Sequence, residues 1–526
     1  MAVQARHRVV SLLLAAFLAT ACGSTVQGSS AQLGPTAVAG GDGLGSPGGA
    51  SPSPTGGGSA PGATGGSLVA GPPGAASLPA TGGGTTGGGT GSAVAGGGVG
   101  TLTSGPGVTA KEVYVGLLYD KNADALNSAA GIGAISSGDS KANTKAIIND
   151  INKHGGVGGR KLVPVYANFD STSTQTLAQQ YAAVCQQFTH DTPRVFAVEG
   201  AIGDEAFRQC LSKAGVAILS ASLPSLGQAD LLRYPGLIEQ GYANVDRLAA
   251  YQVTPLVQQQ YFTPWDSVNG RPAATGTVKV GILTYDDRVF ANAVDRYLVP
   301  ALKRLGYDPQ VARIAQITTA ADYGSQGAAV KSAELSFAAN GVTHVIPFES
   351  NGGLSPFFLP NARSQHYYPR YGINSASAYQ ALLDAGLVEN KQMTGAVGFG
   401  WIPVVDLHAS DDPDNGPYSN VSRRHCVTVM KDSGITFTSG NAEGIALNSC
   451  ATLYLLKTAL DRTPAQITLG TFIGKVESLG TSYQNPGGLG QEFRPGRHDP
   501  SNKAYHWRYV EGCTCFRYEG TLQTVP

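Results

Sequence analysis

The chain repeats the same order of segments twice, and this repeat limits the possible fold more than any other feature. From residue 108 onward, short runs rich in β-branched residues alternate with longer segments whose apolar residues recur at helical spacing. Val278–Leu283 opens the second round with a pattern much like that of Glu112–Leu118, which opens the first. Strands that alternate with helices are typical of parallel sheets with helices on both faces. The sequence therefore predicts an α/β fold of two doubly wound parallel-sheet lobes joined by a multi-strand hinge.

The pattern assigns each segment to a strand or a helix. Strands are expected at Glu112–Leu118, Leu162–Asn168, Val195–Glu199, Val216–Leu219, Val278–Leu283, Val311–Ile314 and His344–Phe348. Helices are expected at Asp139–Lys153, Thr174–Phe188, Asp204–Ala214, Val245–Tyr261, Phe290–Leu305, Val330–Ala339, Ala442–Asp461 and Leu469–Leu479. Short strands are expected to follow at Leu489–Phe493, Ala504–Val510 and Cys515–Tyr518.

These segments divide the body of the chain into parts. The first lobe is expected at residues 108–262 and the second at 277–400, with a linker rich in Pro, Gly and polar residues at 263–276. Residues 401–526 are expected to form helices and strands that cross the hinge, and the helix at 441–461 can return to the first lobe. A body of this length exceeds what one hydrophobic core usually serves.

The first residues of the chain have the pattern of an export signal. Residues 1–21 combine Arg6 and Arg8 with an apolar run that is too short to span a bilayer, which is typical of a secretory signal peptide. The residues around Cys22 resemble a bacterial lipobox, so Cys22 is expected to carry a lipid that anchors the protein on the extracytoplasmic face of the cell membrane. The alternative is cleavage after Ala21, which gives a free secreted protein with an N-terminal cysteine.

Residues 22–107 have a composition that does not support a packed core. They are almost entirely Gly, Ser, Thr, Ala and Pro, and Asp42 is their single charged residue. Such a segment buries too little apolar surface to offset the entropy of ordering it. We expect a disordered tether that spans about 50 Å as a flexible coil.

Charge and motifs exclude several classes of function. The chain holds 36 Lys+Arg and 36 Asp+Glu, so no basic excess is present to neutralise phosphates, and nucleic-acid binding is not expected. We find no G-x-S-x-G, P-loop, H-E-x-x-H or C-x-x-C motif, so neither an enzyme nor a cofactor is predicted. The acidic run at residues 411–415 lacks EF-hand spacing and is interpreted as a solvated loop, so no metal site is predicted.

Six cysteines follow Cys22, and an even number in an exported chain favours disulfides. Cys185 and Cys210 lie on the apolar faces of two helical patterns that flank one strand, which places the helices side by side. The expected pairs are Cys185–Cys210, Cys426–Cys450 and Cys513–Cys515. The alternatives are that Cys513 and Cys515 pair with Cys426 and Cys450, or that these cysteines are buried free thiols.

One segment connects the predicted fold to a known family. Residues 148–162, INDINKHGGVGGRKL, resemble the first helix, tight turn and second strand of the solute-binding proteins for branched-chain amino acids (leucine, isoleucine and valine) and related ligands. Weaker similarities follow in the same order at Val115–Leu118, Val216–Pro224, Thr277–Leu283, Asn441–Leu460 and Gly488–Tyr518. The glycine-rich turn is not a dinucleotide loop, because such a loop runs from a strand to a helix and this one runs from a helix to a strand.

The resemblance implies both a fold and a function. Proteins of this family have the type 1 periplasmic-binding-protein fold and deliver a small polar solute, such as an amino acid or amide, to the permease of an ABC importer. The expected partners are therefore the solute, the permease and the membrane that holds the lipid anchor, and the protein is expected to be a monomer without enzymatic activity. The alternative is a receptor of the same fold that senses a ligand and is not coupled to transport.

Ligands of open α/β sheets bind outside the carboxyl ends of the strands, which nominates candidate contacts in both lobes. The candidates are Tyr119, Asp120, Glu199, Gly200, Ala201, Ser220, Ala221 and Ser222 in the first lobe, and Tyr285, Asp286, Glu349, Ser350, Asn351, Asn374 and Ser375 in the second. Helix capping and hinge hydrogen bonds are the alternative roles for the acidic candidates.

The resemblance also suggests which ligands are favoured. Relatives that bind amino acids hold the α-carboxylate with a hydroxylated loop, whose position Ser220 and Ser222 match. The carboxylate that holds the ammonium group in those relatives falls near Asn374 and Ser375, where this chain has no acid. Together with Glu199, this favours a polyol, amide or cationic ligand over an α-amino acid. The alternative is that Glu349 or Asp286 supplies the carboxylate for the ammonium group from a neighbouring loop.

Overall fold

The structure is a computed structural model, and it describes residues 104–129, 133–200, 202–220, 225–319, 322–350, 352–463 and 465–526. The predicted signal peptide, Cys22 and residues 22–103 of the predicted tether lie outside the described residues. All described residues belong to one compact unit, Gly96–Pro526. None of its described helices is long and apolar enough to cross a membrane.

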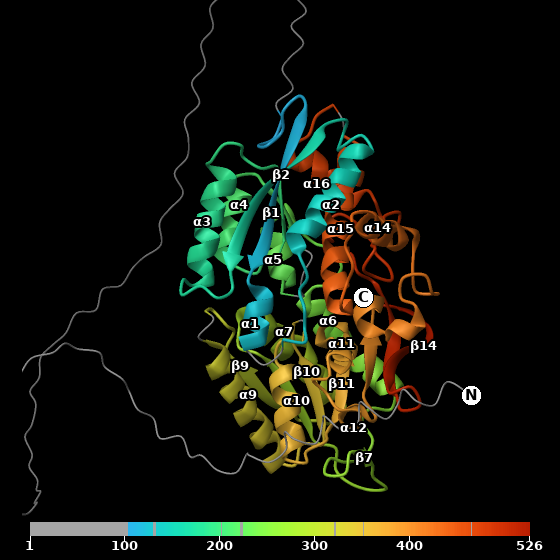
Figure 1. Cartoon of the computed structure of the whole chain (residues 1–526). Coiled ribbons are helices and arrows are strands. Elements are labelled where there is room, and N and C mark those ends of the chain that lie inside the picture. The colour runs from blue at the N-terminus through green and yellow to red at the C-terminus, as the bar shows by residue number, and fades with distance from the viewer. Residues whose placement is uncertain are drawn as a thin grey trace, which may run out of the picture. The chain divides into compact units, whose positions relative to one another are not determined.

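The first lobe is built on a sheet of five parallel strands in the order β2-β1-β3-β4-β5. Figure 1 shows β1 and β2 within this lobe. The strands are β1 (Glu112–Lys121), β2 (Lys161–Asp170), β3 (Ala197–Gly200), β4 (Ala217–Ser220) and β5 (Leu237–Glu239). The helices between them are α1 (Ala123–Ala129), α2 (Ser140–Lys153), α3 (Leu177–Thr189), α4 (Glu205–Lys213) and α5 (Gln228–Arg233). Val115 and Leu117 of β1 pack in the core that contains Ile147 of α2, whereas Leu118 packs in the core that contains Val184 of α3. Both faces of this sheet are therefore covered, as a doubly wound fold requires.

The second lobe is built on a sheet in the order β14-β13-β12-β11-β10-β8-β9. Its parallel part contains β8 (Val280–Tyr285), β9 (Gln310–Ile314), β10 (His344–Phe348), β11 (Arg370–Asn374) and β12 (Val397–Gly400). The edge strands β13 (Lys503–Val510) and β14 (Cys515–Thr524) run antiparallel. This antiparallel edge is formed by two of the short strands expected near the end of the chain, at Ala504–Val510 and Cys515–Tyr518. The turn at residues 511–514 is too short for a crossover, and so short a connection permits only an antiparallel pair.

Several helices cover the second sheet. They are α6 (Val245–Gln258), α7 (Arg288–Ala293), α8 (Val299–Arg304), α9 (Asp322–Ala339), α10 (Ser355–Ser364), α11 (Tyr379–Asp384), α12 (Asn390–Met393) and α13 (Pro403–Asp406), and short helices of other types are η1 (Val294–Leu298), η2 (Ser375–Ser377) and η3 (Ala409–Asp411). The helix predicted at Phe290–Leu305 is thus divided, because a π-helical turn, η1, joins α7 to α8.

Two segments expected outside the second lobe pack against it in the structure: helix α6 and residues 263–276. Helix α6, expected in the first lobe, packs against α7, η1 and β12. Its Tyr251 meets Phe399 edge to face at 5.0 Å between ring centroids, and Gln259, which caps its C-terminal end, donates through Nε2 to Gly398 O at 2.6 Å. The expected interlobe linker at 263–276 contains the small hairpin β6 (Trp265–Asp266) and β7 (Arg271–Pro272). The Trp265 indole donates to Tyr368 O at 2.9 Å, which fixes this hairpin on the second lobe.

The C-terminal part of the chain contributes to both lobes. Helices α14 (Val421–Asp432) and α15 (Gly440–Leu460) pack against α2 of the first lobe, and α16 (Leu469–Glu477) packs against α15. The chain then returns to the second sheet as β13 and β14. Residues 489–493, expected as a strand, contribute only the isolated bridge between Gln491 and Ser501.

The chain crosses between the lobes after β5, after β12 and after α16, and the crossing segments bind one another. Trp401 lies on the second crossing and contacts the other two. Its indole Nε1 donates to Gly241 O at 3.2 Å, and its carbonyl accepts from Leu489 N at 3.2 Å. These bonds make the hinge a set of connected segments.

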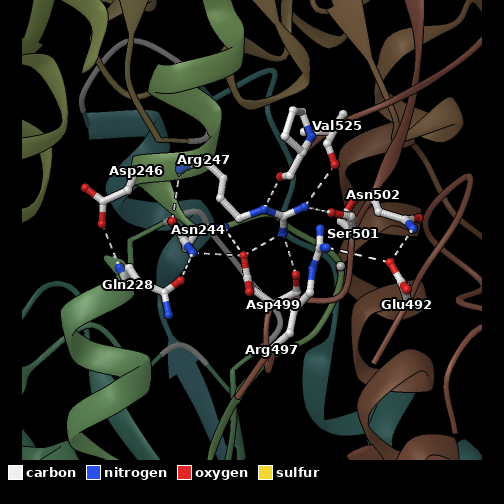
Figure 2. Close-up of polar contacts among 12 residues, drawn as sticks. Gln228, Asn244, Asp246, Arg247, Glu492, Arg497, Asp499, Ser501, Asn502 and Val525 are labelled. Carbon is white, nitrogen blue, oxygen red and sulfur yellow. Dashed lines mark hydrogen bonds and ion pairs between the residues drawn. The ribbon is translucent and has the colours of Figure 1, made fainter. Parts of the chain in front are cut away.

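A polar cluster ties the first crossing to the third (Figure 2). Asp499 Oδ2 accepts hydrogen bonds from Asn244 N at 2.9 Å, Asn244 Nδ2 at 2.9 Å and Arg247 Nη1 at 2.6 Å. Arg247 Nη2 also donates to the backbone carbonyls of Ser501 and Val525, at 3.0 and 3.2 Å. Since Asn244 caps α6, the cluster fixes the start of this helix to the last crossing.

The structure contains the three disulfides that the sequence favoured. Cys185–Cys210 joins α3 to α4, Cys426–Cys450 joins α14 to α15, and Cys513–Cys515 lies at the turn between β13 and β14. The Cα–Cα distances are 6.4, 6.3 and 5.2 Å.

The glycine-rich turn connects α2 to β2, as predicted. Gly156 has a φ of +71°, and a Cβ there would lie 1.9 Å from Arg160 O. Gly158 N donates to Asp461 Oδ1 at 2.7 Å, so the turn also contacts the end of α15. A side chain at Gly156 would prevent the turn from closing.

Candidate functional site

A cleft of about 470 Å³ lies between the two lobes at the carboxyl ends of their strands. Its first-lobe wall comes from the ends of β1 and β2, from α1 and α3 and from the segment after β3. Its second-lobe wall comes from the segments after β8, β9 and β10 and from the starts of α9 and α10. Figure 1 shows α1 between the two lobes. This is the position at which open α/β sheets bind their ligands.

One buried polar atom on each lobe has no partner in this cleft. Asp120 Oδ2 accepts a hydrogen bond from Ser171 Oγ, but Asp120 Oδ1 is buried without a partner among the described residues. Ser350 Oγ, on the second lobe, is likewise buried without a partner there. Buried polar atoms of folded proteins are rarely left unpaired, so these two atoms indicate a place for a ligand group or water.

Asp120 supplies an acidic group to the lining of the cleft. Burial raises the pKa of the Asp120 carboxyl to about 6, although its bonds to Ser171 act in the opposite direction. No Lys or Arg is among the described residues that line the cleft. No group of three or more His, Cys, Asp or Glu that could hold a metal ion occurs in the described part of the chain.

Aromatic rings from the second lobe line part of the cleft. Tyr285 lines it and meets Phe290 edge to face, with 5.3 Å between the ring centroids. Tyr323 and Phe357 line the same wall, with their centroids 6.5 Å apart. The cleft can therefore hold a small molecule that has an apolar part and a few polar groups.

Two of the contacts between the lobes lie beside the cleft. Arg288 Nη2 of α7 lies 2.6 Å from Asp230 Oδ1 of α5, and the Asp230 side chain is 1 % exposed. Leu177 N, at the start of α3, donates to Thr318 O in the segment after β9, at 3.1 Å. These contacts join the two lobes and hold the cleft closed on two sides.

A side chamber of about 270 Å³ adjoins the cleft within the first lobe. Asp120, Ala123, Ser137 and Ile445 line both cavities. The chamber lies at the ends of β1 and β3, between α2 and α15.

The candidates of the first lobe fall into three groups. Asp120 lines both cavities, and Tyr119, Glu199 and Gly200 line the side chamber. Ser220 lines neither cavity, because its hydroxyl donates to the buried Glu239 Oε2 at 3.0 Å. Ala201, Ala221 and Ser222 lie outside the described residues.

In the second lobe, Tyr285 and Ser350 line the cleft, and Asn351 lies outside the described residues. Glu349 does not line it. Its carboxylate accepts from Leu354 N and Ser355 N, at 2.6 and 3.1 Å, at the start of α10. This is the helix-capping role that the sequence offered as the alternative for an acid, and burial raises the pKa of Glu349 to about 7.

The three other candidates of the second lobe also lie outside the lining of the cleft. Asn374 accepts from Ala376 N at 2.8 Å and donates to Gln252 Oε1 at 2.8 Å. Ser375 donates to Asp406 Oδ2 at 2.7 Å. Asp286 is exposed beyond the end of β8. The side chains of Asn374 and Ser375 are thus already engaged in holding the second lobe together.

Sequence reasoning missed several residues that line the cleft. Ser171 directly follows β2, and Gln316 follows β9, so the strand-end rule would have found both if it had been applied to these strands. Tyr323, Gln326 and Phe357 come from the starts of α9 and α10. Their position depends on how the two lobes face each other, and no local sequence pattern reports that.

No protein-family model matches the sequence, and no curated protein matches it. Solved structures do match. A fatty acid ABC transporter substrate-binding protein from Thermomonospora curvata is 17 % identical, covering 81 % of this chain and 94 % of that chain at a TM-score of 0.51. A possible leucine/isoleucine/valine-binding protein from Rhodopirellula baltica SH 1 is 14 % identical. The match covers 78 % of this chain and 97 % of that chain at a TM-score of 0.51.

A third match is the solute-binding protein of an ABC transporter from R. palustris in complex with 4-hydroxybenzoate. It is 13 % identical, covering 79 % of this chain and 98 % of that chain at a TM-score of 0.53. At such identities the likeness shows the fold alone. The chain therefore has the type 1 periplasmic-binding-protein fold, and that prediction is confirmed.

Proposed function

We propose that this protein is an extracytoplasmic solute-binding protein that captures a small polar solute between its lobes and delivers it to the permease of an ABC importer. The observation that carries the proposal is the pair of unpartnered atoms, Asp120 Oδ1 and Ser350 Oγ, on opposite walls of one cleft. A solute that binds both atoms links the two lobes, so its binding favours the closed arrangement. The substrate-binding proteins of similar fold support the same role.

The N-terminal part of the proposal rests on the sequence. Lipidation at Cys22 would hold the protein, as a monomer, on the outer face of the cell membrane, and residues 22–107 would let the lobes reach the permease. Loss of solute uptake after deletion of the gene would support transport. Unchanged uptake with loss of a cellular response to the solute would instead identify a sensing receptor.

A screen for thermal stabilisation tests the binding role. The panel contains amino acids, amides, urea, polyols and small peptides, and a ligand at a hundred times its Kd stabilises the folded state by about 2.7 kcal/mol. A bound solute should raise the unfolding temperature of the wild type more than that of the Asp120→Asn variant. If no solute of any class raises the unfolding temperature, the proposal is wrong.

The ion pair between the lobes gives a more specific prediction. Arg288 pairs with the buried Asp230 only when the lobes are closed, so Arg288→Gln removes a charge that favours closure. We therefore expect the Kd of the bound solute to rise about fivefold. Titration calorimetry measures this change in Kd. Lys303→Gln is the matched control, because Lys303 pairs with Asp308 on the surface of one lobe at 3.0 Å. Equal affinities for the two variants would show that the ion pair does not assist closure.

A further inference from the structure

The side chamber has two acidic groups and no basic one. Glu199, at the end of β3, is 4 % exposed, and its Oε1 accepts from Ser449 Oγ of α15 at 3.0 Å. Asp120, at the end of β1, presents the unpartnered Oδ1 described above. No Lys or Arg is among the described residues that line the chamber. A carboxylate in such a place is costly to ionise unless a cation joins it.

Three aromatic residues also line the chamber. They are Tyr119, Tyr166 and Phe169, and the first two rings meet edge to face at 6.4 Å between centroids. The ammonium of Lys141 lies 5.4 Å from the Tyr119 centroid and 5.1 Å from the Tyr166 centroid. Both distances are within the range over which a ring face attracts a cation. These rings therefore already attract an ammonium group, although Lys141 itself is exposed and does not line the chamber.

Carboxyl groups combined with ring faces favour one class of ligand. An anionic group would meet Asp120 and Glu199 without a compensating cation, and a neutral apolar group would leave Asp120 Oδ1 without a partner. A bare metal ion is not favoured either, because no group of three or more His, Cys, Asp or Glu that could hold one occurs among the described residues. An organic ammonium group satisfies both features, since it can bind a carboxylate and pack against an aromatic ring.

We propose that the side chamber binds the positively charged head of an organic ammonium compound, and that the captured solute is therefore an organic cation. The inference rests on the proposed function and names the class of its solute. The chamber, of about 270 Å³, holds the head group, and the rest of the molecule extends past Asp120 into the cleft. The solute class then differs from the 4-hydroxybenzoate bound by the R. palustris protein, which is a carboxylate.

Titration of the full chain with choline and with putrescine tests this assignment. The neutral isostere of choline, 3,3-dimethylbutan-1-ol, keeps the shape of the head and lacks its charge. We expect choline or putrescine to bind, and the neutral alcohol to bind at least about tenfold more weakly than choline, because a hydrogen bond or contact to a charged group contributes more than a neutral one. If the alcohol binds as well as choline, the chamber does not select charge and the proposal is overturned.

Two substitutions that should change cation affinity in opposite directions make the test more specific. Glu199→Gln keeps an acceptor for Ser449 and removes the negative charge, so cation affinity should fall about tenfold. Lys141→Gln removes the competing ammonium from the Tyr119 and Tyr166 rings, so cation affinity should rise about threefold. Because Lys141 is exposed, this variant tests the proposal even if Glu199→Gln does not fold.

The outcomes separate this inference from the proposed function. Opposite shifts in choline or putrescine affinity for the two variants support the chamber as a cation site. Unchanged affinity in both variants, or shifts in the same direction, overturns it. If no organic cation binds but another solute stabilises the chain, the cation assignment is wrong and the solute-binding role stands. If no solute binds at all, both proposals are wrong.

Discussion

Arg247→Met is expected to lower the free energy of unfolding by about 3–5 kcal/mol, the usual loss when one partner of a buried ion pair is removed. The Asp499 side chain is 2 % exposed, and it would lose a guanidinium donor at 2.6 Å. The carbonyls of Ser501 and Val525 would lose their donor as well. Methionine keeps most of the apolar stem, so the change tests the charge more than the packing. Guanidinium denaturation with the disulfides intact measures it.

A surface pair of the same geometry provides the control. Arg313 Nη2 lies 2.6 Å from Asp295 Oδ1, but the two side chains are 28 % and 59 % exposed. Exposed ion pairs contribute about 0–1 kcal/mol, so Arg313→Met should change the free energy of unfolding by no more than that. Equal losses for Arg247→Met and Arg313→Met would show that the cluster at the hinge is no more important than a surface contact.

Stability is expected to decrease as the pH rises from about 5 to 8. Burial raises the pKa of several carboxyls, among them Glu199, Glu349 and Asp406 (to about 7) and Glu239 (to about 8). A carboxyl with a raised pKa binds its proton more tightly in the folded state than in the unfolded state. Its stabilising contribution is therefore complete below the unfolded value and is lost as the pH rises through the folded value. Scanning calorimetry at several pH values should show Tm falling across this window.

One of these carboxyls can be removed with little change of shape. Glu349→Gln leaves an oxygen to accept from Leu354 N and Ser355 N, and it removes the group that titrates. Each titrating carboxyl contributes up to about 1.4 kcal/mol per pH unit, so the variant should lose less stability between pH 5 and 8 than the wild type. A pH dependence identical to that of the wild type would mean that Glu349 does not titrate in this range.

The fold could be predicted because its signals are local. His344–Phe348 is an apolar run between a helix and a turn, and the structure begins and ends β10 at these two residues. The assignment of α6 to a lobe could not be predicted, since Val245, Leu248 and Leu256 are buried on a helix that either sheet could receive. The choice depends on tertiary partners such as Phe399, which is distant in the sequence.

The site could be predicted only in part, for a similar reason. The strand-end rule places a residue near the cleft, but it does not report whether the side chain has another partner. Asp120 lies near the end of β1, and Glu349 directly follows β10. The Glu349 carboxylate accepts a hydrogen bond from Leu354 N at the start of α10, whereas Asp120 keeps an oxygen without a partner among the described residues. The bond from Ser375 to Asp406 likewise depends on the tertiary structure.

The central claim is that the lobes close on a solute, and one distance measures this most directly. Spin labels introduced through a genetically encoded amino acid at Thr174 and Ser325 would report on opposite sides of the cleft, close to the contact of Leu177 with Thr318. We expect a broad distribution of label distances without solute, and a shorter and narrower one when a solute from the stabilisation screen is present. A distribution that stays unchanged at saturating solute would contradict closure, and with it the capture of a solute between the lobes.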